Sequence, residues 1–164
     1  MTAFPLSSTI TAAAEDVRSA DAVQLLDELT GELAALYKIG DGRAGFDPSD
    51  VEQPRAAFVI ARVDGYPAGC GALRPLDAQS GEIKRMYTRP AFRRRGVAQA
   101  VLAEIERLAV GFGYTTLKLQ TGPLQPEAAA LYERVGYRRI PRFAGNWERV
   151  LAYQKDLEPA AGHR

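Results

Sequence analysis

Apolar and polar residues follow two different periods along this chain, and the two periods alternate. Apolar residues recur at every third or fourth position in three segments, which predicts helices at residues 21–37, 97–112 and 126–135. Runs rich in β-branched, aromatic or alternating apolar residues predict strands at residues 8–14, 56–63, 67–73, 82–88, 115–119, 137–140 and 149–155. Gly31 interrupts the first helical pattern and could divide it into two helices.

Turn and capping residues lie at the boundaries of these segments. Asp21 is a suitable N-cap for the first helix. Asp64-Gly65 separates two strand patterns, which is typical of a tight hairpin. Pro126 fits the first turn of the last helix, and Gly136 fits its end. Three glycines and a proline predict a loop at residues 40–50.

This order of elements predicts an α/β (α+β) fold with a mixed, mostly antiparallel central sheet and helices on both faces. With 164 residues, the chain is expected to form a single domain at residues 1–157. Residues 158–164 contain proline, glycine and polar residues, and we expect them to be a flexible C-terminal tail.

The overall composition excludes several classes of function. Charged residues make up 25% of the chain, but the net charge is only +1, which argues against a nucleic-acid-binding protein. Cys70 and His163 are the single cysteine and the single histidine, so a Cys/His zinc site is excluded and no metal is expected. The sequence shows neither a membrane-spanning apolar run nor a signal peptide, which favours a cytoplasmic protein.

A short basic and glycine-containing segment lies between a predicted strand and a predicted helix. Its sequence is Arg93-Arg94-Arg95-Gly96-Val97-Ala98. Main-chain N–H groups in the first turn of a helix have no partner within the helix, and the helix dipole attracts anions to them. Glycine lets an anion approach the main chain closely. The segment is therefore a candidate phosphate-binding loop, although a solvated basic loop is the plainer alternative.

The chain resembles the GNAT superfamily of acyl-CoA N-acyltransferases, and the resemblance covers nearly all of it. Residues 93–98 match the family's Gln/Arg-x-x-Gly-x-Gly/Ala loop. Residues 125–137 are similar to its Asn-x-x-Ala-x-x-Leu-Tyr-x-x-x-Gly-Phe/Tyr segment, with Gln125 where asparagine is usual. The resemblance implies a GNAT-like fold, acetyl-CoA as the donor and a primary amine as the acceptor. Dimers are common in the family, so a homodimer stays open.

The resemblance also implies where acetyl-CoA would bind. Main-chain N–H groups of the loop would hold the pyrophosphate, and the strand at residues 86–88 would pair with the pantetheine arm. In the family this strand and the strand after the phosphate-binding helix, here residues 115–119, separate to admit the arm. The implied cofactor-binding residues are Met86, Tyr87, Thr88, Arg93, Arg94, Arg95, Gly96, Val97, Ala98, Gln99 and Gln125.

Two residues are candidates for proton transfer. In related enzymes a glutamate at the place of Glu82 takes the proton of the amine, and Tyr132 corresponds to a tyrosine that protonates the departing sulfur. The alternatives are structural: Glu82 could pair with Lys84 or Arg85 at the surface, and Tyr132 could be a packing residue. The main-chain N–H of Met86 or Tyr87, at a bulge, is the expected oxyanion donor.

The acceptor site is expected near the first helix, its following loop and the last strands. Tyr37, Arg85 and Phe143 are the candidate substrate-binding residues. Phe46 and Trp147 could extend an apolar wall, and Arg74, Arg85 or Arg142 could hold a carboxylate or phosphonate. We expect a small amine, amino-acid-like or aminoalkyl. A protein or peptide amine, or a non-catalytic acyl-CoA-binding module, are the alternatives.

Overall fold

The computed structural model describes residues 8–38 and 45–159, which form one seven-stranded mixed sheet with helices on both faces. The strands are β1 (Ile10–Ala14), β2 (Ala57–Val63), β3 (Tyr66–Pro75), β4 (Ser80–Thr88), β5 (Thr116–Thr121), β6 (Arg138–Ile140) and β7 (Leu151–Asp156). The helices are α1 (Ala20–Tyr37), α2 (Val97–Gly111) and α3 (Pro126–Arg134), with short 3₁₀ turns η1 (Pro48–Val51) and η2 (Pro90–Phe92). The sheet order is β1-β2-β3-β4-β5-β7-β6, and every neighbouring pair is antiparallel except β4 and β5. The predicted fold class is confirmed.

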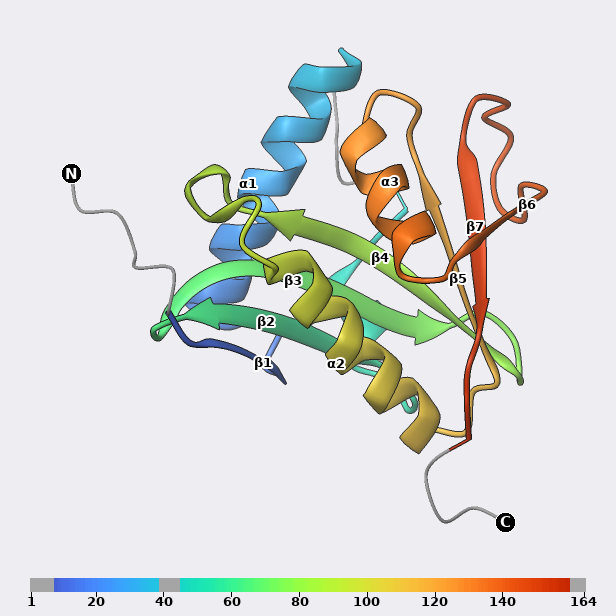
Figure 1. Ribbon diagram of the computed structural model, residues 1–164, viewed down its shortest axis with the longest axis horizontal. Helices are drawn as coiled ribbons and strands as arrows, with labels where there is room; N and C mark the ends of the chain where they lie inside the picture. Colours follow the sequence, from blue (N-terminus) through green and yellow to red (C-terminus); the bar gives the residue numbers. More distant parts are fainter. Residues whose placement is uncertain (1–7, 39–44, 160–164) are drawn as a thin grey trace.

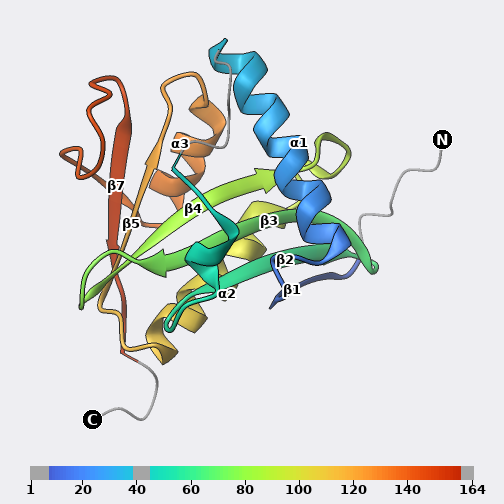
Figure 2. The same cartoon turned by 180° about the vertical axis from the view of Figure 1, so that it is seen from behind.

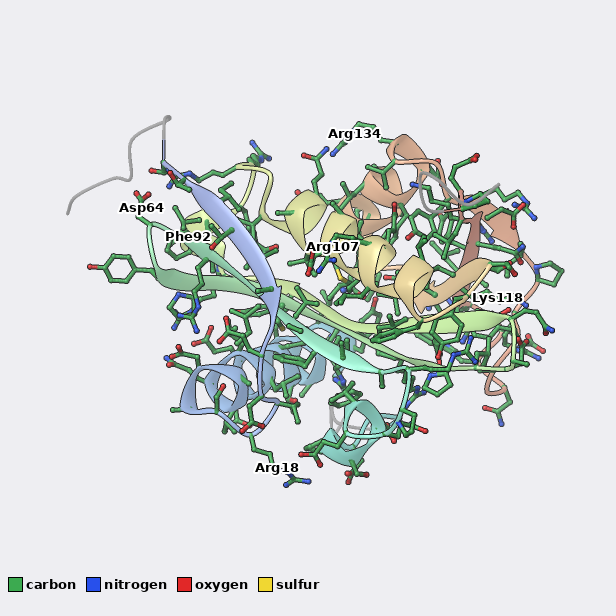
Figure 3. All side chains as sticks on the ribbon, turned by 90° about the horizontal axis from the view of Figure 1, so that it is seen from below. Arg18, Asp64, Phe92, Arg107, Lys118 and Arg134 are labelled. Atoms are coloured by element: carbon green, nitrogen blue, oxygen red, sulfur yellow. The ribbon has the colours of Figure 1, made fainter. Side chains whose placement is uncertain are left out.

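The helices form two layers around the sheet. Figure 1 shows α2 in front of the sheet, and Figure 2 shows α1 on the opposite face. The edge-on view in Figure 3 places α1 and η1 on one side and α2 and α3 on the other. Each face has its own apolar core: Ile60 and Leu25 belong to the cluster under α1, and Val59 and Ile105 belong to the cluster under α2. Burial of both faces explains why β2 is apolar almost throughout.

Helix α1 differs from the sequence prediction in two details. Its N-cap is Ser19, whose hydroxyl accepts a hydrogen bond from the N–H of Ala22, so the helix begins before Asp21. Gly31 does not divide the helix, which continues to Tyr37. Packing of Leu25 and Leu29 against the sheet outweighs the roughly 1 kcal/mol that an interior glycine costs.

The loop and tail predictions reach segments outside the described residues. Of the loop expected at residues 40–50, positions 40–44 lie outside, and part of the remainder forms η1 rather than irregular structure. Of the tail expected at residues 158–164, positions 160–164 lie outside, including His163.

The β2–β3 hairpin turns at Asp64-Gly65, as predicted. Both residues have positive φ, 50° and 88°, which is the conformation of a type I′ turn. The next ladder, between β3 and β4, contains a register shift: Cys70 pairs with Tyr87, whereas Ala72 pairs with Lys84. The extra residue on β4 is accommodated at Arg85, whose φ is 57°. A β-bulge therefore lies in the middle of β4, where it redirects the main chain.

Strands β4 and β5 are paired over only part of their length. Their parallel ladder runs from Ser80↔Thr116 to Ile83↔Leu119, although β4 continues to Thr88 and β5 to Thr121. Figure 1 shows the two strands diverging on either side of α3. Within the described residues, the outer half of β4 thus has no ladder partner on its β5 side. Its main-chain groups on that side form an unpaired sheet edge.

Candidate active site

A cavity of about 1470 Å³ occupies the space between the diverging strands. Its walls come from the end of α1, the outer half of β4, the start of α2, the end of β5, α3 and the segment before β7. Two of the sequence-predicted groups meet there: the loop before α2 and the residues of α3. A cavity of this size, with one end at a helix N-terminus, is large enough for an extended phosphorylated ligand.

The N-terminus of α2 offers unpaired main-chain donors to this cavity. Gly96 is the N-cap, with φ 85°, and no side chain caps the helix. The N–H groups of Gly96, Val97, Ala98 and Gln99 meet no acceptor among the described residues, and the first helical bond is donated by Ala100 to the carbonyl of Gly96. All four residues line the cavity. Donors, dipole and glycine together fit a pyrophosphate.

The three arginines of the loop have different roles. Arg93 donates to the carboxylate of Glu32 at 2.6 Å and to the carbonyl of Thr88 at 3.0 Å, which ties the loop to α1 and β4. Arg94 is exposed, has φ 63° and lines the cavity. Arg95 turns toward β1, where it lies 3.5 Å from the hydroxyl of Ser8, and it does not line the main cavity. Arg94 is therefore the arginine best placed to meet a bound phosphate.

The outer half of β4 forms one wall of the cavity. Met86 and Thr88 line it, as does Tyr87, which also donates from its hydroxyl to Glu28 on α1 at 3.2 Å. Burial, with the nearby Glu28 carboxylate, raises the pKa of Tyr87 to about 12. The bulge at Arg85 lies at the inner end of this wall, so the main chain predicted to supply the oxyanion donor does leave the regular ladder there.

Tyr132 presents its hydroxyl to the cavity. The side chain is 4% exposed, packs edge-on against Tyr137 with ring centroids 5.9 Å apart, and lines the cavity. Its hydroxyl has no hydrogen-bond partner among the described residues. None of the fully buried side-chain nitrogen or oxygen atoms of these residues lacks a partner. The hydroxyl must therefore reach the open space. Burial raises the pKa of this phenol, which keeps it protonated at neutral pH.

Glu82 is buried, contrary to the alternative of an exposed residue paired with Lys84 or Arg85. It lies directly across the β3–β4 ladder from Arg74, whose Nε donates to Oε1 at 2.9 Å. Arg74 also binds Asp50 at 2.6 Å, which anchors η1 to the sheet. Glu82 does not line the cavity, and its Oε2 has no partner among the described residues. Because no fully buried side-chain oxygen or nitrogen of the described residues is unpaired, that second oxygen retains access to solvent.

Tyr37 closes the cavity beside the β5–α3 loop. Its hydroxyl donates to the side-chain oxygen of Gln125 at 2.9 Å and accepts from the N–H of Leu124 at 3.3 Å. Trp147 packs edge-on against its ring at a centroid distance of 5.5 Å. The side chain of Gln125 thus links the start of α3 to the end of α1. Sequence spacing gave no sign of this contact across 88 positions.

Gly122 leaves the space that the Tyr37 ring occupies. A Cβ at this position would collide with the Tyr37 hydroxyl and ring. We predict that Gly122→Ala lowers the free energy of unfolding by about 1–3 kcal/mol through overpacking. Chemical denaturation measures this change.

Gly31→Ala is the matched control: nothing lies within 4 Å of its added Cβ, and the same substitution inside a helix should stabilise by about 0.5–1 kcal/mol. Equal effects at both glycines would contradict the contact.

Of the remaining candidate residues from the sequence, some line the cavity and others do not. Arg85 lines the cavity and stacks over the ring of Phe46 at 5.5 Å. Phe143 does not line it; Lys118 lies over its ring at 5.8 Å. Arg142 is exposed outside the lining, and Cys70 is fully buried, with burial raising the pKa of its thiol.

Two further observations concern metal binding and membrane insertion. No group of three or more His, Cys, Asp or Glu side chains among them is arranged to hold a metal ion. No helix within residues 8–38 and 45–159 combines the length and the apolar character needed to span a bilayer.

Comparison with known sequences gives a consistent result. The sequence model of the acetyltransferase (GNAT) family matches residues 22–137. An "IAA acetyltransferase" from Azospirillum brasilense is 33% identical over 130 residues, which cover 78% of this chain and 84% of that protein. YsnE of Bacillus subtilis (strain 168), an uncharacterized N-acetyltransferase, is 44% identical over 93 residues, covering 56% of this chain and 62% of its own length.

Solved structures share the fold over nearly the whole chain. A proposed acyl-CoA N-acyltransferase from Klebsiella pneumoniae superposes with a TM-score of 0.73 at 27% identity, covering 94% of this chain and 100% of that one. A GNAT family acetyltransferase from Elizabethkingia anophelis, solved with acetyl-CoA bound, has a TM-score of 0.66 at 19% identity and covers 90% of this chain and 98% of its own. At that identity the second likeness concerns the fold alone.

Proposed function

The chain belongs to the GNAT family of acetyltransferases, and from this premise we propose that it transfers the acetyl group of acetyl-CoA to the primary amine of a small, amino-acid-like or aminoalkyl molecule. One observation carries the proposal: a single cavity joins the unpaired N–H groups at the N-terminus of α2 to the Tyr132 hydroxyl, along an unpaired strand edge. These features support binding of a phosphate at one end and reaction of a thioester at the other.

The donor fits this cavity in an extended form. The N–H groups of residues 96–99 would hold the pyrophosphate, with Arg94 beside it. The edge of β4 beyond Ile83 would pair with the amides of the pantetheine arm, as an added strand does. This placement brings the thioester between the β4 bulge and Tyr132. The Elizabethkingia structure, which is similar in fold, holds acetyl-CoA, and this agrees with the choice of donor.

The proposed reaction is direct attack in a ternary complex. The amine lone pair forms the C–N bond with the thioester carbonyl carbon, and the carbonyl π electrons move to oxygen. A main-chain N–H at the bulge, from Met86 or Tyr87, stabilises this oxyanion. The oxyanion then re-forms the carbonyl as the C–S bond breaks. Tyr132 donates its proton to the sulfur that receives the electron pair, because its protonated hydroxyl faces the cavity, and the second proton that the nitrogen loses as the amide forms restores the phenol through water.

The amine must lose a proton before or during attack. A free amine with a pKa near 10 must give up about 4 kcal/mol of proton affinity at pH 7. Glu82 is the proposed acceptor of this proton, through water, since it does not line the cavity itself. Arg74 holds one carboxylate oxygen and leaves Oε2 available.

We predict that Glu82→Gln lowers kcat most at low pH, where the amine is most protonated. A loss of kcat that does not depend on pH would assign Glu82 a structural role only.

The proposal is tested by acceptor-dependent release of CoA. The protein is mixed with acetyl-CoA and either small amines or peptides, and the free thiol is measured. Release that requires a small amine supports the proposal. Release only with peptides would replace it by a protein or peptide acetyltransferase. Saturable acetyl-CoA binding without turnover would favour a non-catalytic module, and absence of acetyl-CoA binding would refute the phosphate site before α2.

A further inference from the structure

The cavity lining is far more basic than the rest of the chain. Seven basic residues and two acidic residues line it, whereas the whole chain has a net charge of +1. Of the two acidic residues, Glu32 is bound to Arg93, and Glu127 is exposed on the first turn of α3. Arg93 and Arg94 lie at the phosphate end, beside the start of α2. The other basic residues therefore call for a separate explanation.

Lys84 lies at the opposite end of the cavity wall from α2. It precedes the bulge on β4, where the last paired residue of the β4–β5 ladder is Ile83. Its side chain is half-buried, lines the cavity and forms no ion pair among the described residues. The nearby carboxylates, Glu82 and Asp50, are already bound by Arg74. Burial lowers the pKa of the Lys84 ammonium, as expected for a cation without a close counter-ion.

Arg149 supplies a second positive charge to the cavity lining. It is exposed, lines the cavity and forms no ion pair among the described residues. Burial raises the pKa of Tyr37, and the positive charge of Arg149 opposes this effect. Trp147, two residues earlier, packs against the Tyr37 ring and brings this segment to the cavity. Two cations without carboxylate partners, one on β4 and one before β7, thus line the cavity in addition to the arginines of the loop at the start of α2.

We propose that the acceptor amine carries an oxyanion group, a carboxylate or phosphonate, and that Lys84 with Arg149 binds this group. This inference rests on the proposed function, because the phosphates of acetyl-CoA account for the cations at the other end. Arg74, one of the sequence candidates for this task, is occupied by Glu82 and Asp50, and Arg142 lies outside the cavity lining. An oxyanion beside Lys84 would direct the amine toward the bulge on β4.

The experiment compares matched acceptors that differ only in this group. Each amino carboxylate is paired with its neutral carboxamide and with the corresponding aminophosphonate, and kcat/KM is measured for each. The wild-type protein should prefer the oxyanionic acceptors by at least about tenfold, as charge-assisted hydrogen bonds predict. The ratio of carboxylate to phosphonate rates identifies which oxyanion the site takes.

Variants at Lys84 test the residue itself. Lys84→Met should lower kcat/KM for oxyanionic acceptors by about 10- to 100-fold, mainly through KM, and should change the carboxamide rate by less than about threefold. Lys84→Arg should keep the preference. Lys118→Met is the matched control, because Lys118 lies on the neighbouring strand outside the cavity lining, and Figure 3 shows it at the far end of the sheet from Phe92. The Kd of acetyl-CoA should not change in any variant.

Several outcomes would overturn this inference without touching the acetyltransferase. Equal turnover of carboxylates and carboxamides, equal losses for both in Lys84→Met, or turnover of peptides and neutral amines alone would each do so. Absence of acetyl-CoA binding in the wild-type protein would instead refute the proposed function, and the inference with it.

Discussion

Replacing Tyr132 with phenylalanine is expected to lower kcat by about 10²- to 10⁴-fold while leaving the fold and acetyl-CoA affinity intact. The phenol hydroxyl has no partner among the described residues and faces the cavity, so its removal leaves no buried group unpaired. What is lost is the donor to the departing sulfur, and general acids contribute effects of this size. Steady-state CoA release gives kcat, and calorimetry gives the Kd of acetyl-CoA.

Tyr137 provides the matched control for this substitution. Its ring packs against Tyr132 in the same core, but its hydroxyl donates to Glu106 at 3.0 Å and it does not line the cavity. Tyr137→Phe should therefore lower the melting temperature more than Tyr132→Phe does, with little effect on kcat. If Tyr132→Phe kept kcat within about threefold of the wild type, its hydroxyl would have no part in the chemistry.

Replacing Arg74 with methionine is expected to destabilise the protein by about 3 kcal/mol. Glu82 is only 4% exposed, and loss of Arg74 removes the one cation that forms an ion pair with its carboxylate among the described residues. Asp50 loses the same partner, which loosens η1 from the sheet. Chemical denaturation at neutral pH measures the change. The double variant Arg74→Met with Glu82→Gln should recover much of the loss, because the buried charge is then absent.

An exposed ion pair of similar geometry is the control for this prediction. Arg18 binds Glu52 at 2.8 Å, but their side chains are 59% and 39% exposed. Arg18→Met should change stability little, since water and salt screen such a pair. Comparable losses at Arg74 and Arg18 would mean that burial of Glu82 does not govern the effect.

The local elements were predictable because their signals lie within a few residues of one another. Asp64-Gly65 predicted the hairpin, and both residues adopt the positive φ that the turn requires. The glycine before α2 likewise predicted a helix start with free donors, and Gly96 is its N-cap. The helix boundary at Ser19 was missed because Asp21 is an equally good capping residue by type, and only the geometry of the chain chooses between them.

The candidate site was predictable only as far as its motifs extend. The loop at residues 93–98 and Tyr132 lie within contiguous signatures, and both reach the cavity except for Arg95. Phe143 was chosen for its aromatic character and its place near the last strands, but the turn before β7 carries Trp147 to the cavity instead. No sequence pattern indicated that Lys84 would line the cavity, since a lysine in a strand is usually solvated.

By itself, the sequence determined the elements, their approximate limits, the two-faced sheet and the start of α2 at Gly96, because periodicity, turn chemistry and capping act over short distances. The tertiary structure alone decided which distant groups meet. The register of β3 and β4 placed Arg74 against Glu82, the space at Gly122 admitted Tyr37, and the end of the β4–β5 ladder at Ile83 opened the cavity. Those outcomes depend on packing between segments far apart in the chain, which no local pattern encodes.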